Sequence, residues 1–109
     1  MIKVTFTEEG NKLSLRLEGH AGYAEHGKDI VCASASILAF TVAQFVMEAE
    51  HKGDLKAPAE VKVEGGDAFI SCEPTEEGFS MMQNMYLFAK IGYALLQHNH
   101  PQYVRLIES

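Results

Sequence analysis

Two stretches of alternating apolar and polar residues constrain this chain more than any other feature, because a period of two is typical of half-buried β-strands. In residues 2–18 the alternation runs on both sides of a polar turn at residues 8–11. Residues 60–72 repeat the arrangement around the glycine-rich turn at residues 65–67. Each stretch therefore predicts a β-hairpin.

A long apolar segment follows each hairpin and predicts a helix. The first helix is expected from residue 30 to about residue 51, and the second from about residue 76 to residue 98. Asp29 fits the N-cap position of the first helix, and Thr75 fits that of the second. Residues 103–107 predict a short last strand.

The order of these elements, ββαββα(β), indicates one small α+β domain over residues 1–109, with a mostly antiparallel sheet and two helices. The second helix is apolar nearly all round, so it should be buried on two sides. In so small a domain this pattern favours a partner subunit, and we expect a homodimer.

Charge and cysteine content narrow the function classes. The formal net charge is −6 and the basic residues form no cluster, which argues against direct nucleic-acid binding. The N-terminus lacks the apolar run of a signal peptide, and the apolar-rich runs contain polar residues that fit core helices better than membrane spans. Two cysteines in such a chain favour reduced thiols, so we expect a cytoplasmic protein without membrane contact. A Cys32–Cys72 disulfide is the minor alternative.

Residues 19–36 carry the groups suited to thiol chemistry. His20 stands at one end of a glycine-punctuated loop and Cys32 at the other. Cysteine catalysis needs a base near the thiol and surroundings that favour the thiolate. With Asp29 as N-cap, Cys32 falls in the first helical turn, where unpaired amides stabilise an anion and can hold an oxyanion. The glycines that give the loop freedom to close over a bound chain are Gly19, Gly22 and Gly27.

The residues alone leave other interpretations open. A free cysteine at the start of a buried helix is more often a small core residue than a nucleophile. His26 could replace His20 as the base, and Cys72 falls on the apolar face of its strand, where a core role is expected. A zinc site built from these histidines and cysteines lacks the usual ligand spacing. We expect neither a metal nor another cofactor.

Three groups of residues in this segment form one combined pattern: Gly19-His20-Ala21, then Gly27-Lys28-Asp29-Ile30-Val31-Cys32-Ala33, and Ser36. This pattern resembles the ribosomal-processing cysteine proteases of the Prp family and is far more specific than its parts. The resemblance extends over the whole chain in length and in strand–helix order. Ala33-Ser34-Ala35 departs slightly from the family's more usual Ala-Ala-Val, which leaves the Cys-His dyad untouched.

The resemblance implies a cysteine endopeptidase with Cys32 as the nucleophile and His20 as the general base. It implies supporting roles for Asp29 and Ser36. It also implies a homodimer that removes the N-terminal extension of ribosomal protein twenty-seven of the large subunit, cutting just after an aromatic pair. One alternative is a non-catalytic, ribosome-associated binding module with an inert thiol, and another is a thiol redox or acyl-transfer protein. The residues of the implied substrate loop are Gly19, Ala21, Gly22 and Gly27.

Overall fold

The computed structural model describes residues 1–19, 26–64 and 67–108, with the backbone alone for residues 26–29 and 108. The predicted α+β class, with two helices and a mostly antiparallel sheet, is confirmed in this part of the chain. The elements in chain order are β1 (Ile2–Glu9), β2 (Lys12–Glu18), α1 (His26–His51), β3 (Glu60–Glu64), β4 (Asp67–Cys72), α2 (Phe79–Asn99) and β5 (Val104–Glu108).

The described strands form one five-stranded sheet in the order β3-β4-β2-β1-β5. The pairs β1–β2, β2–β4 and β3–β4 are antiparallel, whereas β1 and β5 are parallel. The β2–β4 pair joins the two hairpins, with Leu13 opposite Cys72 and Glu18 opposite Asp67. The end of β2 therefore lies beside the start of β4, which brings the second hairpin next to Gly19.

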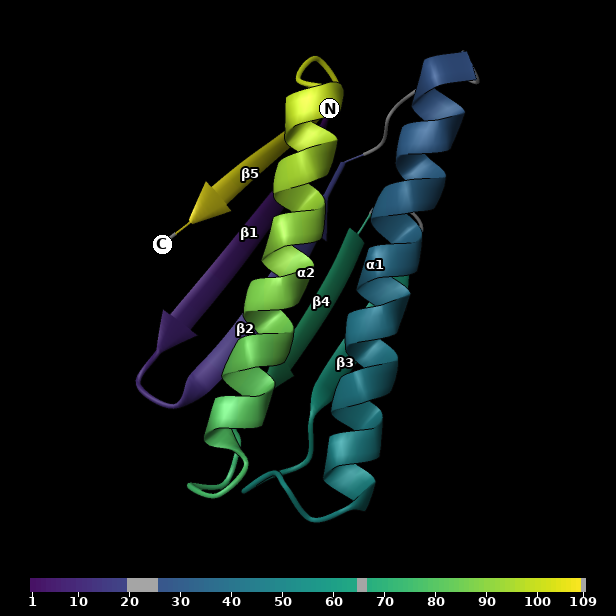
Figure 1. The fold of residues 1–109 in the computed structure, drawn as a ribbon. Coiled ribbons are helices and arrows are strands. Elements are labelled where there is room, and N and C mark those ends of the chain that lie inside the picture. The colour runs from purple at the N-terminus through teal and green to yellow at the C-terminus, as the bar shows by residue number, and fades with distance from the viewer. Residues whose placement is uncertain (20–25, 65–66, 109) are drawn as a thin grey trace.

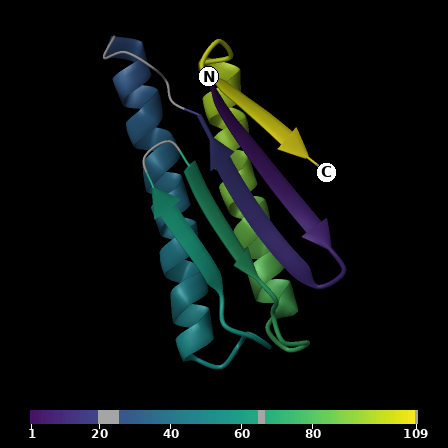
Figure 2. The ribbon, with the colours of Figure 1, turned by 180° about the vertical axis from the view of Figure 1, so that it is seen from behind.

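Both helices cover the same face of the sheet, so the molecule has two layers (Figure 1). Seen from behind, the strands lie in front and both helices lie behind them, with α1 on the side of β3 (Figure 2). The period-two pattern of the sequence is expressed as burial, because alternate strand residues face the helices. The fully buried strand residues include Val4, Leu15 and Ile70.

Helix α1 packs against the sheet and covers the apolar core on that side. Its buried residues recur every three or four positions and join the same apolar cluster as the strand residues. By length and composition alone, Ile30–His51 is apolar enough to cross a membrane. The packing of its buried face against the sheet, however, is that of a core helix. The residues of this face are Val31, Ala35, Ala39, Val42, Ala43, Val46 and Ala49.

Both helices begin at residues other than those predicted. Helix α1 starts at His26, so Asp29 lies inside the helix and is not its N-cap. Helix α2 starts at Phe79, and the residues just before it form a turn. The Thr75 hydroxyl accepts a hydrogen bond from the Gly78 N–H at 3.1 Å. Thr75 therefore closes this turn instead of capping the helix as predicted.

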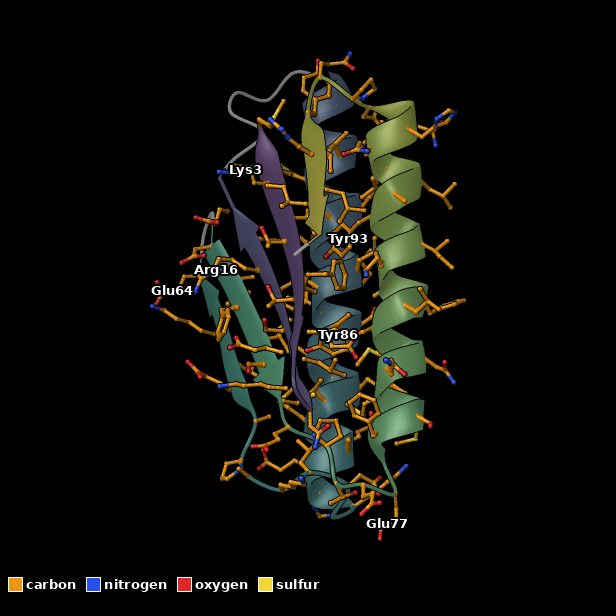
Figure 3. All side chains as sticks on the ribbon, turned by 90° about the vertical axis from the view of Figure 1, so that its left-hand side faces the viewer. Lys3, Arg16, Glu64, Glu77, Tyr86 and Tyr93 are labelled. Carbon is orange, nitrogen blue, oxygen red and sulfur yellow. The ribbon has the colours of Figure 1, made fainter. Side chains whose placement is uncertain are left out.

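Two buried tyrosines of α2 tie the layers together. The Tyr86 hydroxyl lies 3.2 Å from the Leu13 carbonyl oxygen and 3.3 Å from that of Ile70, so it donates to the sheet. The Tyr93 hydroxyl donates to the Ala35 carbonyl of α1 at 2.9 Å. Figure 3 shows both side chains in the layer between α2 and the sheet. One helix is thus anchored to the sheet by one tyrosine and to the other helix by the second.

Candidate active site

Cys32 lines a pocket of ≈ 120 Å³ at the place where α1 meets one end of the sheet. It is a free thiol with intermediate exposure. Segments distant in the sequence build the walls, because the pocket lies between α1, the end of β2 and the second hairpin. The other lining residues that bear on function are Gly19, Ser36, Phe40, Val63, Glu64 and Asp67.

The structure brings three of the predicted site residues to this one pocket: Cys32, Ser36 and Gly19. Ser36 lies one helical turn after Cys32 and therefore on the same side of α1. Gly27 and Asp29 belong to the start of α1, where the backbone alone is described. The pairing of His20 with Cys32 stays a prediction. The predicted residues outside the described ranges are His20, Ala21 and Gly22.

The predicted position of Cys32 in the first helical turn is wrong. Because α1 begins at His26, Cys32 is its seventh residue and lies in the second turn. Only the first four N–H groups of a helix lack a partner within it, and the dipole effect falls off within that turn. The amide of Cys32 is therefore part of the helical ladder and is not one of the unpaired amides that were expected to hold an oxyanion.

The second hairpin contributes a wall of the pocket that sequence reasoning missed. Val63 and Glu64 come from β3, and Asp67 is the first residue of β4. They reach Cys32 because Glu18 pairs with Asp67 across the β2–β4 ladder. Short-range sequence patterns carry no signal for the pairing of strands so far apart. The one signal in the sequence was the presence of two predicted hairpins, because pairing one with the other would have suggested that the second lies close to Cys32.

Two acidic residues of the second hairpin, Glu64 and Asp67, are among the residues that line the pocket. Glu64 is exposed, and Asp67 Oδ1 lies 3.4 Å from Arg16 Nη1. The guanidinium of Arg16 also stacks on the Phe69 ring, 4.6 Å from its centroid. Arg16 and Glu64 appear on the sheet side of the molecule, away from α2 (Figure 3). The exposed ion pair contributes little to stability, and the charge of Arg16 offsets that of Asp67. Glu64 is therefore the acidic residue here that favours a cationic group.

Cys72 occupies a different environment at the other end of β4. It is only 3% exposed, and burial raises the pKa of its thiol to about 11, against a smaller lowering effect of a hydrogen bond with Tyr86. A buried, protonated thiol is a poor nucleophile, so Cys72 is a core residue as predicted. Both cysteines are free, and the alternative of a Cys32–Cys72 disulfide is wrong in this structure.

Potential metal ligands are scattered over the molecule. Within residues 1–19, 26–64 and 67–108, no three His, Cys, Asp or Glu side chains are grouped closely enough to hold a metal ion. Within the described part of the chain, the pocket offers the thiol of Cys32 and, one helical turn later, the hydroxyl of Ser36.

A sequence model of the family described as cysteine protease Prp matches residues 1–105. The chain belongs to this family. Two curated relatives are named ribosomal processing cysteine protease Prp. The one from Staphylococcus aureus is 41% identical over 39 residues, which are 36% of this chain and 37% of the relative. The one from Bacillus subtilis is 43% identical over 42 residues, 37% of this chain and 38% of the relative. The aligned parts thus cover less than two fifths of these relatives.

Solved structures extend the similarity over the whole fold. The structure of SMU.848 from Streptococcus mutans superposes with a TM-score of 0.71 at 27% identity, covering 99% of this chain and 93% of the other. The S. aureus protease Prp, solved in complex with a substrate peptide, gives a TM-score of 0.72 at 19% identity with 100% of both chains covered. At that identity the second likeness supports the fold alone.

Proposed function

We propose that this protein is a cysteine endopeptidase in which Cys32 is the nucleophile and His20 the general base. The observation that carries the proposal is the partly exposed Cys32 thiol in a pocket shared with Gly19, the residue directly before His20. Membership of a family of cysteine proteases supports the same assignment. Asp29 and Ser36 act in support, Ser36 from the pocket wall.

In this mechanism His20 takes up a proton as each new bond to the carbonyl carbon forms and returns it as the old bond breaks. His20 takes the proton of the Cys32 thiol, and the sulfur attacks the carbonyl carbon of the scissile peptide bond. The C–N bond then breaks, the imidazolium returns its proton to the leaving amine, and a thioester remains on Cys32. Water, deprotonated by His20, hydrolyses this thioester and restores the free thiol.

The proposed substrate is the N-terminal extension of ribosomal protein twenty-seven of the large subunit, cut after an aromatic pair in the cytoplasm. The pocket includes apolar side chains, among them Val63 and Phe40, which suit apolar substrate residues. The net charge of −6 suits a basic ribosomal protein. The substrate loop of this mechanism contains Gly19, Ala21, Gly22 and Gly27.

We also propose a homodimer formed through the outer face of the two helices. A groove of ≈ 490 Å³ between α1 and α2 is lined almost entirely by apolar side chains. Large apolar side chains remain exposed on both helices, and Phe88 is 80% exposed. A patch of this kind is typical of a subunit interface. Its exposed members include Ile37, Phe45, Met81, Phe88, Ile91 and Leu95.

The test is intact-mass spectrometry of the full-length ribosomal protein precursor, with its extension confirmed present, after incubation with the protein. We expect one cut near the N-terminus with the wild type and none with Cys32→Ser. Cys72→Ala is the matched control, because it removes the other cysteine, and we expect it to cut as the wild type does. Cleavage by Cys32→Ser, or an uncut precursor with the wild type, would refute the protease and favour the binding module.

A further inference from the structure

One edge of the sheet runs along the pocket that contains Cys32. Strand β3 stands at the end of the strand order and pairs with β4 alone among the described residues. The opposite edge is different, because the Leu106 N–H of β5 donates to Gln97 Oε1 of α2 at 2.6 Å. An edge strand presents backbone groups to which another extended chain can bind. The edge of β3 is therefore the better placed of the two for such a chain.

The hairpin register shows which groups of β3 point to that edge. Glu64 pairs with Asp67, which is only three residues further along the chain. These two residues must form a hydrogen-bonded pair, because in a non-hydrogen-bonded pair the next ladder bonds toward the turn would have to join two adjacent residues. Hydrogen-bonded and non-hydrogen-bonded pairs alternate along an antiparallel ladder. Val63 and Ala68 therefore form a non-hydrogen-bonded pair, and the N–H and C=O of Val63 point away from β4.

Val63 is also where the edge meets the pocket. Its side chain is 41% exposed and lines the pocket together with Cys32 and Phe40. Helix α1 lies behind β3 and reaches past its free edge (Figure 2). A chain added to β3 would thus have one row of side chains facing α1 and the alternate row facing away from it, because strand side chains alternate.

We propose that the substrate peptide binds as an additional β-strand on the free edge of β3, with its backbone hydrogen-bonded to Val63. This inference rests on the proposed protease function. The added strand carries the peptide backbone past the Cys32 thiol. Main-chain bonds supply affinity in this binding mode, and the alternate side chains supply specificity. The row that faces α1 meets apolar groups such as Phe40, which is 52% exposed, so the site selects apolar residues at alternate positions.

The charges of β3 suit a peptide with basic residues. Two of the three charged residues on the face of β3 that points away from α1 are Glu60 and Glu64, which lie opposite Ser71 and Asp67. Basic peptide residues in the row facing away from α1 would meet these carboxylates, and opposite charges on neighbouring strands stabilise their pairing.

The first test uses the substrate. A peptide spanning the N-terminal extension of ribosomal protein twenty-seven is synthesised with a single N-methyl group at each successive residue. We expect kcat/KM to fall about tenfold at every second position and to change little at the positions between, because only alternate N–H groups face β3. Uniform losses on both sets of positions, with the unmodified peptide still cleaved, overturn the edge-strand inference and leave the protease standing.

The second test changes the enzyme. Val63→Pro removes the outward N–H at an edge position where proline is compatible with the sheet, and Val63→Ala is the control that keeps the N–H. We expect kcat/KM to fall about tenfold in the proline variant and much less in the alanine variant, with the circular dichroism spectrum of both unchanged. Equal effects of the two variants, or a change of oligomeric state with cleavage intact, contradict the inference. A peptide that the wild type neither binds nor cleaves refutes both proposals.

Discussion

Gly19 illustrates how a single residue shapes the pocket. Its φ is +98°, a conformation that favours glycine, and a Cβ placed there would collide with the backbone carbonyl oxygen of Met1. We expect Gly19→Ala to lower the free energy of unfolding by about 2 kcal/mol and to slow cleavage, because the displaced backbone lines the Cys32 pocket. Urea unfolding and the cleavage rate measure the two effects.

The control for this change is Gly53→Ala. Gly53 has a φ of +83°, but nothing lies within 4 Å of the position of its Cβ, and it is not among the residues that line the pocket. We therefore expect a loss of about 1 kcal/mol from the backbone conformation alone, with cleavage unchanged. Cleavage at the wild-type rate by Gly19→Ala would contradict the role assigned to Gly19.

The buried thiol of Cys72 predicts a loss of stability in alkaline solution. Its pKa is about 11 in the folded chain, against 9.0 for an unperturbed thiol. Between these values the folded state holds the proton more tightly than the unfolded state, so the free energy of unfolding falls as the pH rises through that window. We expect the loss between pH 8 and pH 11 to be about 2 kcal/mol smaller in Cys72→Ala than in the wild type. Equal losses in urea titrations of both proteins would argue against this origin.

At the scale of elements, the contact between α2 and α1 is positioned by a hydrogen bond next to the site. Tyr93 donates to the carbonyl of Ala35, and Ala35 lines the pocket with Cys32. We expect Tyr93→Phe to lower the free energy of unfolding by about 1 kcal/mol and also to lower kcat, because α1 loses the bond that positions this turn.

Tyr86→Phe is the matched control for Tyr93. The Tyr86 hydroxyl is also buried and also donates to carbonyl oxygens, but these belong to Leu13 and Ile70 of the sheet. A similar loss of stability with kcat unchanged is the expected result for Tyr86→Phe. If kcat falls in both variants, and by the same amount for a given loss in the free energy of unfolding, then Tyr93 has a structural role only.

The elements were predictable to different degrees. Period-two alternation in the sequence indicated both hairpins. Burial follows it residue by residue in β1 and β2, whereas β3 is mostly exposed and the last three residues of β4 are all buried. The start of α1 was misplaced because Asp29 is a favourable N-cap by residue type, yet a cap stabilises a helix by only about 1 kcal/mol, which a few further helical residues can outweigh. The turn before α2 was missed because Thr75 can accept a hydrogen bond either in a turn or at a helix start.

The candidate site was predictable only on the helix side. The sequence indicated Cys32, Ser36 and Gly19, which lie near one another along the chain or in one motif, and the structure places all three at one pocket. Val63 and Asp67 were not indicated, because their approach depends on the β2–β4 pairing, which no local pattern specifies. Strand order is a property of the whole sheet and is decided by packing against both helices.

At the scale of the whole molecule, the two-layer arrangement leaves the outer face of both helices without a covering layer (Figure 1), and Phe88 on that face is 80% exposed. We expect the wild type to be a dimer at micromolar concentration and Phe88→Glu to be a monomer, since a charge at the centre of an apolar interface is costly to bury. Size-exclusion chromatography with light scattering measures both.

The control is Lys62→Ala, which makes the same unit change of charge on the exposed strand β3 and should remain a dimer. A monomeric wild type would refute the interface, and a dimeric Phe88→Glu would place it elsewhere.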